Sequence, residues 1–474
     1  MAAETSIQRQ GLTWRHAMVL FTCALGTLIP TAIVYTAGGL CFTPVSNALG
    51  VERSQVTIYL TMVFIANLVM AVPMANMFDR FPIRIFVPIC TILVGVPYFL
   101  MGFYDQIWMW WISGFIIGAG LVCVEFTTTA GVLSKWFHTK YGFVIGLVFA
   151  CTGLGGIVFN LWGQFILGVD LSGWRDLYHI FGIVILVICI PFQVIFLRRT
   201  PQEVGLLPYG LPLSEENKNE IVEIDPSTLP GWTFKEARKM PVFWMLCILG
   251  GLLCTITQFS QMFSTYVQFL GHEGWGGQAI VALLLLSGTL EAFASGGQAG
   301  GKIIIGAVES ANLVAALCLG AAGGVIGVVM IWQIPQLLGE SGIWIMFCGG
   351  AVYGLVYALS TAGIPYITRE VFGSKDYDRI YSVVIAVFNG IGAIGVTSWA
   401  LIQENAGWDG YFIVGVIAIL VMLALGLVVA IRGYKQREEP STGWYTPEVE
   451  HQQTGKIRNA ERRALYESQH PQAS

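Results

Sequence analysis

Glu125 is an ionisable residue in the middle of a long apolar stretch, where a charge is costly. It lies about nine residues from the charged end of that stretch, which at about 1.5 Å per residue is roughly 14 Å deep if the stretch is a membrane helix. A charged side chain there costs at least about 2.5 kcal/mol, so it faces a partner or a water-filled cavity. A carboxyl group withdrawn from water can also retain a proton at neutral pH. We therefore predict a proton-coupling role for Glu125, the alternative being a structural glutamic acid bonded to a neighbouring helix.

Glu291, Gln298 and Lys302 form a polar stripe on another apolar stretch. Their spacing puts them within a few tens of degrees of one another on a helix, with Ser295 close by. Lipid would expel a stripe that bears both charge signs, so we expect it to line an internal cavity and to bind substrate. Glu291 is a second candidate proton carrier. The alternative is an internal pair between Lys302 and a glutamate, or a Lys302 side chain that reaches the aqueous surface.

Weaker polar stripes at helical spacing occur on three further apolar stretches. They are Thr257, Gln261, Ser264 and Gln268; Tyr353, Tyr357 and Ser360; and Asn160 with Gln164. Polar residues of membrane helices more often bond to a neighbouring helix than to a ligand. Gln261 and Tyr357 are nevertheless our candidates for further substrate contacts.

Twelve apolar segments long enough to cross a membrane must position these residues. They span approximately 16–40, 55–77, 85–104, 108–133, 142–168, 176–197, 241–270, 278–308, 311–332, 343–367, 380–403 and 410–432. Of the 25 Lys and Arg residues, only Arg53 and Arg175 fall on the outer side of the spans. Because Lys and Arg near span ends are retained in the cytoplasm, both termini are predicted to be cytoplasmic. A content of 55% hydrophobic and 11% charged residues agrees, since no soluble core could hide that much apolar surface.

The chain consists of two similar halves. A Gly-Trp pair followed by charge precedes the sixth span at Gly173 and the twelfth span at Gly407. We predict an all-α membrane protein of two six-helix bundles, organised as bundle 1–197, cytoplasmic linker 198–240, bundle 241–432 and cytoplasmic tail 433–474. Duplicated bundles place a substrate site between the halves near the membrane midplane, and rocking of one half on the other gives alternating access.

The second span ends in the segment from Ala75 to Arg84, ANMFDRFPIR. It resembles the Gly-x-x-x-Asp-Arg-x-Gly-Arg-Arg signature of the major facilitator superfamily, with Ala75 and Pro82 in place of two glycines. The resemblance implies a twelve-helix transporter. Charged residues at a short turn can bond to helix ends and to neighbouring helices. We therefore expect Asp79, Arg80 and Arg84 to help set a gate, the alternative being a solvated basic loop.

Within the superfamily, the sequence is similar to oxalate/formate antiporters and monocarboxylate carriers. The similar segments are Tyr35 to Pro44, Arg53 to Val56, Lys135 to Phe137, Lys140 to Gly142, Thr200 to Leu206 and Phe372 to Lys375. This resemblance implies that Lys302 stands where carboxylate-carrying relatives place an Arg. The eleventh span lacks the Lys that oxalate-handling relatives carry there. A monocarboxylate, or an acid with an aromatic or larger apolar body, therefore fits better than oxalate.

Two motif matches do not indicate nucleotide binding. The glycines at 390, 392 and 395 match a dinucleotide fingerprint but lie inside a membrane span with no preceding strand. The segment Gly296–Ile303 nearly spells a phosphate-binding loop, but Ile303 replaces the metal-binding hydroxyl. No arrangement of nucleophile, base and orienting group stands out. We expect no enzyme activity, no cofactor, no metal and no nucleic-acid partner.

These observations predict a secondary active transporter in the cell (inner or plasma) membrane. It would move a small organic anion, a mono- or dicarboxylate, by proton symport or anion exchange. Its partners would be that substrate, protons or a counter-anion, and the lipid bilayer. The alternatives are efflux of an apolar or cationic compound, with the glutamates as counter-charges, and a non-transporting membrane receptor on the same scaffold. A channel is a third alternative, disfavoured by the duplicated halves.

Overall fold

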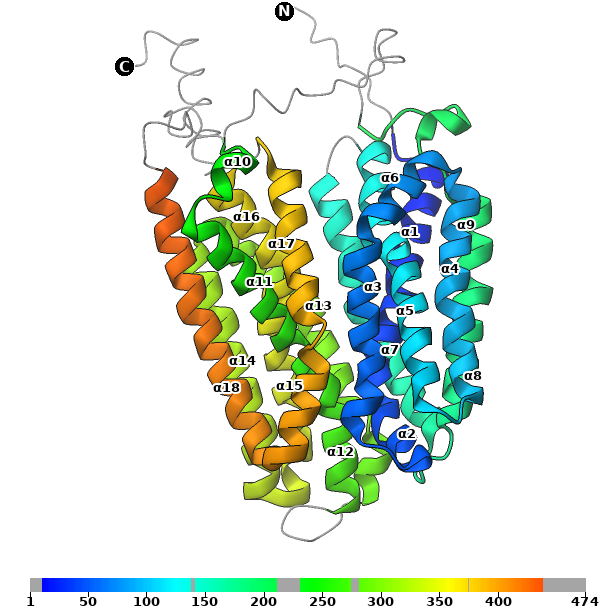
Figure 1. Cartoon of the computed structure of the whole chain (residues 1–474), viewed down its shortest axis with the longest axis vertical. Helices are drawn as coiled ribbons and strands as arrows, with labels where there is room; N and C mark the ends of the chain where they lie inside the picture. The colour runs from blue at the N-terminus through cyan, green and yellow to red at the C-terminus, as the bar shows by residue number, and fades with distance from the viewer. Residues whose placement is uncertain (1–10, 138–140, 211–230, 274–280, 374, 438–474) are drawn as a thin grey trace, which may run out of the picture.

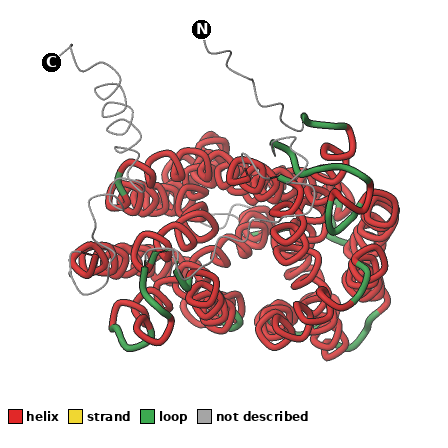
Figure 2. Tube along the Cα trace, turned by 90° about the horizontal axis from the view of Figure 1, so that it is seen from above, coloured by secondary structure: helices red, strands yellow, loops and turns green. Residues whose placement is uncertain are grey.

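The computed structural model describes residues 11–137, 141–210, 231–273, 281–373 and 375–437. These residues fold into helices joined mainly by short connections (Figures 1 and 2). The predicted linker at 198–240 is therefore described only at its two ends, and the predicted tail lies outside the described residues beyond position 437.

Helices of the first half occupy one side of the molecule in Figure 1. They are α1 (Trp14–Tyr35), α2 (Phe42–Leu49), α3 (Arg53–Arg80), α4 (Ile83–Leu100), α5 (Ile107–Val122), α6 (Thr128–Trp136), α7 (Tyr141–Leu167), α8 (Trp174–Val184) and α9 (Ile190–Phe196). Short turns link several of them: η1 (Ala37–Cys41), η2 (Met101–Phe103), η3 (Cys123–Thr127), η4 (Ile185–Cys189) and η5 (Pro201–Val204).

Helices of the second half lie on the other side of the molecule (Figure 1). They are α10 (Phe234–Ala237), α11 (Pro241–Phe259), α12 (Phe263–His272), α13 (Thr289–Ala311), α14 (Leu313–Leu338), α15 (Ile343–Ala358), α16 (Ile364–Phe372), α17 (Tyr377–Gly392) and α18 (Gly395–Arg437). The linking turns are η8 (Ser260–Met262), η9 (Val281–Leu286), η10 (Gly339–Gly342) and η11 (Leu359–Gly363).

Hydropathy and length together mark nine stretches of the described residues as able to cross a membrane. Two of the nine contain two crossings each: Leu313–Thr361 turns back near Gly339, and Arg379–Gln436 turns back at Gly407. Gly407 permits this turn because its φ of 68° is in the left-handed region. Helix α13, which carries the polar stripe, is not among the nine, yet its 23 residues reach across the second bundle as the predicted eighth span (Figure 1).

The predicted spans match the helices in order and differ from them mainly at their ends. The predicted eighth span begins at 278, whereas α13 begins at Thr289 after the 3-10 turn η9. The fourth, sixth and tenth spans each contain a single π-helical turn, η3, η4 and η11 respectively. Such turns are rare and are frequent at functional sites. Glu125 lies within η3.

The two bundles contact each other along several pairs of helices. Helix α13 packs against α7, and α3 packs against α17 and the first part of α18. At the end of the molecule that holds α2 and α12, these two short helices also touch (Figure 1). We call this interface between the two bundles the seam. Packing between the bundles decides which residues meet there, so the candidate site is sought at the seam.

Candidate functional site

Lys302 joins the two bundles near the middle of α13. Its ammonium donates hydrogen bonds to the carbonyl oxygen of Phe149 at 2.9 Å and to Oγ1 of Thr152 at 3.1 Å, both on α7 of the first bundle. These acceptors are neutral, and no salt bridge to Lys302 occurs within the described residues. A carboxylate would bind this ammonium more strongly than neutral oxygens do.

Glu125 approaches Lys302 from the first bundle. Its side chain is only 5% exposed, and it interacts electrostatically with Lys302. The two side chains form no direct salt bridge, since among described residues only Arg175 and Asp105 meet that criterion. Residues that the sequence places in the fourth and eighth spans thus face each other across the seam. The structure places them as neighbours, rather than as the closed internal pair that the sequence left open.

Tyr35 and Asn67 form a hydrogen-bonded pair close to Glu125. The Tyr35 hydroxyl accepts a hydrogen bond from Nδ2 of Asn67 at 2.7 Å. Tyr35 also lies within electrostatic reach of Glu125 in its own bundle and of Tyr357 in the other. The predicted contact Tyr357 therefore lies close to the Lys302–Glu125 region. The sequence showed no periodic pattern around Asn67, because it is a single polar residue in an otherwise apolar face.

Apolar side chains from both bundles close one side of this region. Phe64 of α3 forms a buried cluster with Cys254 of α11 and Ala393 at the end of α17, and Phe388 packs against it. The Phe64 ring lies 5.4 Å from the ring of Tyr35. The seam thus offers a charged side and an aromatic side, which is an arrangement suited to a ligand with an anionic end and an apolar body.

Glu291 takes a different direction from Lys302, although both belong to the predicted stripe. It is 2% exposed, and its Oε1 accepts a hydrogen bond from Ser260 at 3.1 Å, within the second bundle. Its other carboxyl oxygen has no partner among the described residues. Tyr353 lies nearby and donates to the carbonyl of Ile256. Glu291 is therefore a neighbour of Tyr357 rather than of Lys302.

The remaining two predicted substrate contacts are buried against helices. Gln298 is 4% exposed, and its backbone packs directly against Gly354 of α15. Gln261 lies in η8, where its carbonyl oxygen meets Gly39 of the first bundle so closely that a Cβ on Gly39 would collide with it. Gln261 thus belongs to the seam near α2 and α12, at a different level from Lys302.

Several hydrogen bonds between the bundles close the seam at that end of the molecule, and four of them are considered together. Arg53 Nη1 donates to Gln403 Oε1 at 2.9 Å, and the Ser54 amide donates to Glu404 Oε1 at 2.8 Å. The side-chain amide of Gln268 donates to the Leu40 carbonyl at 3.1 Å, and the Gly288 amide donates to Gln164 Oε1 at 2.9 Å. Each bond joins one bundle to the other. We call this group the outer latch, because the distribution of Lys and Arg residues predicts that this end faces outward.

The predicted gating turn lies at the opposite end of α3. Arg80 and Arg84 are exposed, and the side chain of Asp79 lies outside the described residues. Arg199, which follows the sixth span, donates from Nη2 to the carbonyls of Phe78 and Phe81 and stacks on the Phe78 ring. It thereby caps the C-terminal end of α3 with a cation, which suits the helix dipole. No sequence pattern distinguishes Arg199 from the other basic residues after the sixth span.

Two helical bundles with a cation and a carboxylic acid facing each other across their seam define a membrane transport protein. The Major Facilitator Superfamily family model matches residues 17–338, so the chain belongs to that superfamily. It is accordingly a multi-pass membrane protein and a secondary transporter, in a family of transporters rather than enzymes. The prediction of an all-α membrane fold is confirmed.

Known relatives are distant. The chain is 23% identical over 384 residues to the uncharacterized MFS-type transporter YhjX of Escherichia coli (strain K12), covering 78% of this chain and 85% of YhjX. It is 21% identical over 160 residues to the uncharacterized MFS-type transporter YcxA of Bacillus subtilis (strain 168), which covers 33% of this chain and 38% of YcxA.

Solved structures share the fold. The nucleoside transporter NupG superposes with a TM-score of 0.61 at 13% identity, covering 90% of this chain and 100% of NupG. A bacterial homolog to the human lysosomal transporter Spinster, in an inward-facing and occupied conformation, gives 0.59 at 14% identity, covering 92% and 100%. At this identity the likeness establishes the fold alone.

Proposed function

We propose that this transporter moves a small organic anion by proton symport or anion exchange. The observation that supports this most is Lys302, whose ammonium lies between the bundles with neutral hydrogen-bond partners and Glu125 nearby. A substrate carboxylate would replace the carbonyl and hydroxyl acceptors on α7. Because those acceptors belong to the opposite bundle, the exchange would also loosen one link between the bundles.

The chemistry of the seam favours a monocarboxylate with an apolar or aromatic body. A single ammonium is a compact charge that cannot hold a dicarboxylate in the bidentate manner of arginine. The rings of Tyr35 and Phe64 and the side chain of Phe388 offer an apolar surface on the other side. The resemblance to oxalate/formate antiporters and monocarboxylate carriers supports the same substrate class.

Glu125 would couple the anion to a proton. With Lys302 nearby, Glu125 has a neutralising charge across the seam. A substrate carboxylate that neutralises Lys302 removes that support, so Glu125 would then bind a proton, and anion and proton would cross together. If Glu125 retains its proton throughout, the same site would exchange one anion for another.

Alternating access would proceed by breaking and remaking the outer latch. In our proposal the face with α10 and the start of α1 is cytoplasmic, and the face with α2 and α12 is external. Both termini would then be cytoplasmic, as the distribution of Lys and Arg residues indicates. Asp79, Arg80 and Arg84 would act at the cytoplasmic gate, next to the α3 end that Arg199 caps.

Transport in proteoliposomes tests this function. An inward proton gradient or a trans anion should drive accumulation of a carboxylic acid chosen by a thermal-shift screen. Lys302→Gln should weaken anion binding far more than Lys302→Arg, because only the latter keeps the charge. The matched control is Lys239→Gln, which removes an exposed charge outside the spans. Equal losses in both Lys302 variants would indicate a structural lysine, and failure to move any acid would refute the proposal.

A further inference from the structure

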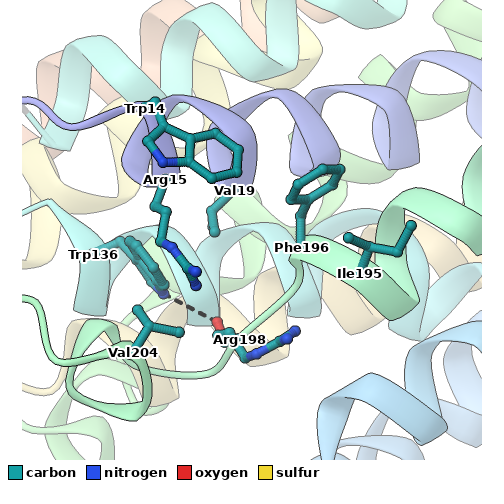
Figure 3. Close-up of a pocket in the computed structure, with 8 residues that line it drawn as sticks. All are labelled: Trp14, Arg15, Val19, Trp136, Ile195, Phe196, Arg198 and Val204. Atoms are coloured by element: carbon teal, nitrogen blue, oxygen red, sulfur yellow. Dashed lines mark hydrogen bonds between the residues drawn. The ribbon is translucent and has the colours of Figure 1, made fainter.

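A cavity lies on the first bundle, at the same end of the molecule as the start of α1. Its volume is about 170 Å³, enough for a group of several atoms. Its walls come from the start of α1, the end of α6, the end of α9 and the chain that follows α9 (Figure 3). They comprise Trp14, Arg15, Val19, Trp136, Ile195, Phe196, Arg198 and Val204. It includes none of the side chains that surround Lys302.

Two arginines supply the charge of this cavity. The pKa of Arg198 is lowered, first by burial and then by the neighbouring positive charges of Arg84 and Arg15. The negative charge of Glu203 acts in the opposite direction and raises the pKa. Glu203 is engaged elsewhere, since its Oε1 accepts from the amides of Arg199 at 3.1 Å and Thr200 at 3.3 Å. Within the described residues, neither Arg15 nor Arg198 forms a salt bridge. The cavity therefore holds cations that repel each other and lack a direct counter-charge.

An aromatic ladder leads from the cavity along the outside of the first bundle. Trp14 is 61% exposed and its ring lies 6.0 Å from that of Phe196. Phe196 is followed by Phe192 at 5.8 Å and then by Phe21 at 5.6 Å. Exposed aromatic rings at a span end are typical of the membrane interface, with deeper rings facing acyl chains. A ligand bound here would contact both the charged cavity and the aromatic ladder.

Two hydrogen bonds position the polar side of the cavity. Trp136 donates from Nε1 to the carbonyl oxygen of Arg198 at 3.0 Å (Figure 3). Arg198 Nη1 donates to the carbonyl of Leu197 at 2.7 Å. The backbone at Arg198 is thus tied to the end of α6. The guanidinium retains further N–H groups that an anionic oxygen can accept from.

We propose that this cavity binds the phosphate headgroup of an anionic phospholipid from the adjacent leaflet, with Arg15 and Arg198 on the phosphate and the aromatic ladder along an acyl chain. Arginine recognises phosphate through paired N–H donors. Basic pockets at helix ends on the cytoplasmic side suit anionic headgroups. The ladder distinguishes a lipid from a soluble anion, because inorganic phosphate would make no use of it.

Lipid titration of the purified full-length protein tests this site independently of transport. Delipidated protein in detergent is titrated with phosphatidylglycerol or phosphatidylcholine, and bound lipid is counted by native mass spectrometry. We expect Arg15→Gln combined with Arg198→Gln to weaken phosphatidylglycerol binding roughly 30-fold, equivalent to about 2 kcal/mol for two interfacial charges. Arg15→Lys with Arg198→Lys should lose less affinity than the Gln variant, because it keeps both charges but not the paired N–H donors.

The matched control removes two exposed charges from the second bundle, Arg238→Gln with Arg432→Gln. It should change the affinity by less than twofold. Equal losses in the cavity variant and in this control, or equal binding of phosphatidylcholine by the unmodified protein, would overturn the proposal. Thermal stabilisation by inorganic phosphate alone that matches the lipid would identify a soluble-anion site instead. If the double variant does not fold, Arg15→Gln alone should weaken binding about fivefold.

Discussion

Glu404 offers the sharpest test of how the outer latch works. It directly follows the eleventh span, in the second bundle, and its carboxylate accepts a hydrogen bond from the Ser54 amide at 2.8 Å. Ser54 is in the first turn of the 28-residue helix α3, whose own flanking residue Glu52 makes no side-chain cap. The second bundle therefore caps a helix of the first. Arg53 adds an electrostatic attraction to the same carboxylate.

We expect Glu404→Ala to shift the protein towards states in which this seam is open. A side-chain cap at a helix N-terminus contributes about 0.5–2 kcal/mol, and a charge near the helix dipole about 0.3–1 kcal/mol. Because both are present only when the bundles meet, loss of about 1–2 kcal/mol should raise the open population about 5- to 30-fold.

Labelling of a buried cysteine measures that population. Thr57 is 0% exposed, lies one turn below Ser54, and donates to Thr397 of the other bundle at 3.2 Å. A Thr57→Cys variant should react with a membrane-impermeant thiol reagent only when the seam opens. Glu404→Ala on that background should raise the labelling rate about 5- to 30-fold when opening and closing are fast relative to the labelling reaction.

Asn405→Ala is the control, because Asn405 is exposed beside Glu404 and its side chain donates to the Leu401 carbonyl of its own helix at 2.8 Å, its one hydrogen bond among the described residues. A Glu404→Ala rate equal to that of the parent or of Asn405→Ala would refute the idea that the carboxylate holds the bundles together.

Two further predictions concern closure and coupling. Gly39→Ala should also raise the labelling rate of Thr57→Cys, because the added Cβ would collide with the Gln261 carbonyl across the seam. Gly300→Ala is the control and should leave the rate unchanged, since a Cβ there meets nothing within 4 Å. Equal rates in the two variants would argue against a tight closure at Gly39. Glu125→Gln should abolish proton-driven accumulation in proteoliposomes while anion counterflow survives, and unchanged accumulation would assign the proton to another group.

The sequence by itself determined the number and order of the membrane spans and the superfamily. Long apolar runs and short charged turns carry this information locally, because lipid requires each span to satisfy its own backbone. Helix α13 is not among the stretches that hydropathy and length mark as membrane spans. The spacing of Glu291, Gln298 and Lys302 nevertheless predicts that this segment is helical. The domain boundaries at 197, 240 and 432 remain predictions.

Only the tertiary structure decided which polar residues meet. Helical periodicity predicts that Glu291 and Lys302 share a face, but Lys302 bonds to α7 of the first bundle, whereas Glu291 bonds to Ser260 of the second. A helix face is wide enough to border two neighbours, and sequence does not say which neighbour lies at each level. The π-turn at Glu125 adds a local change of register without a sequence signal. The outer latch likewise joins residues 124 to 350 positions apart, so only the packing of the bundles could reveal it.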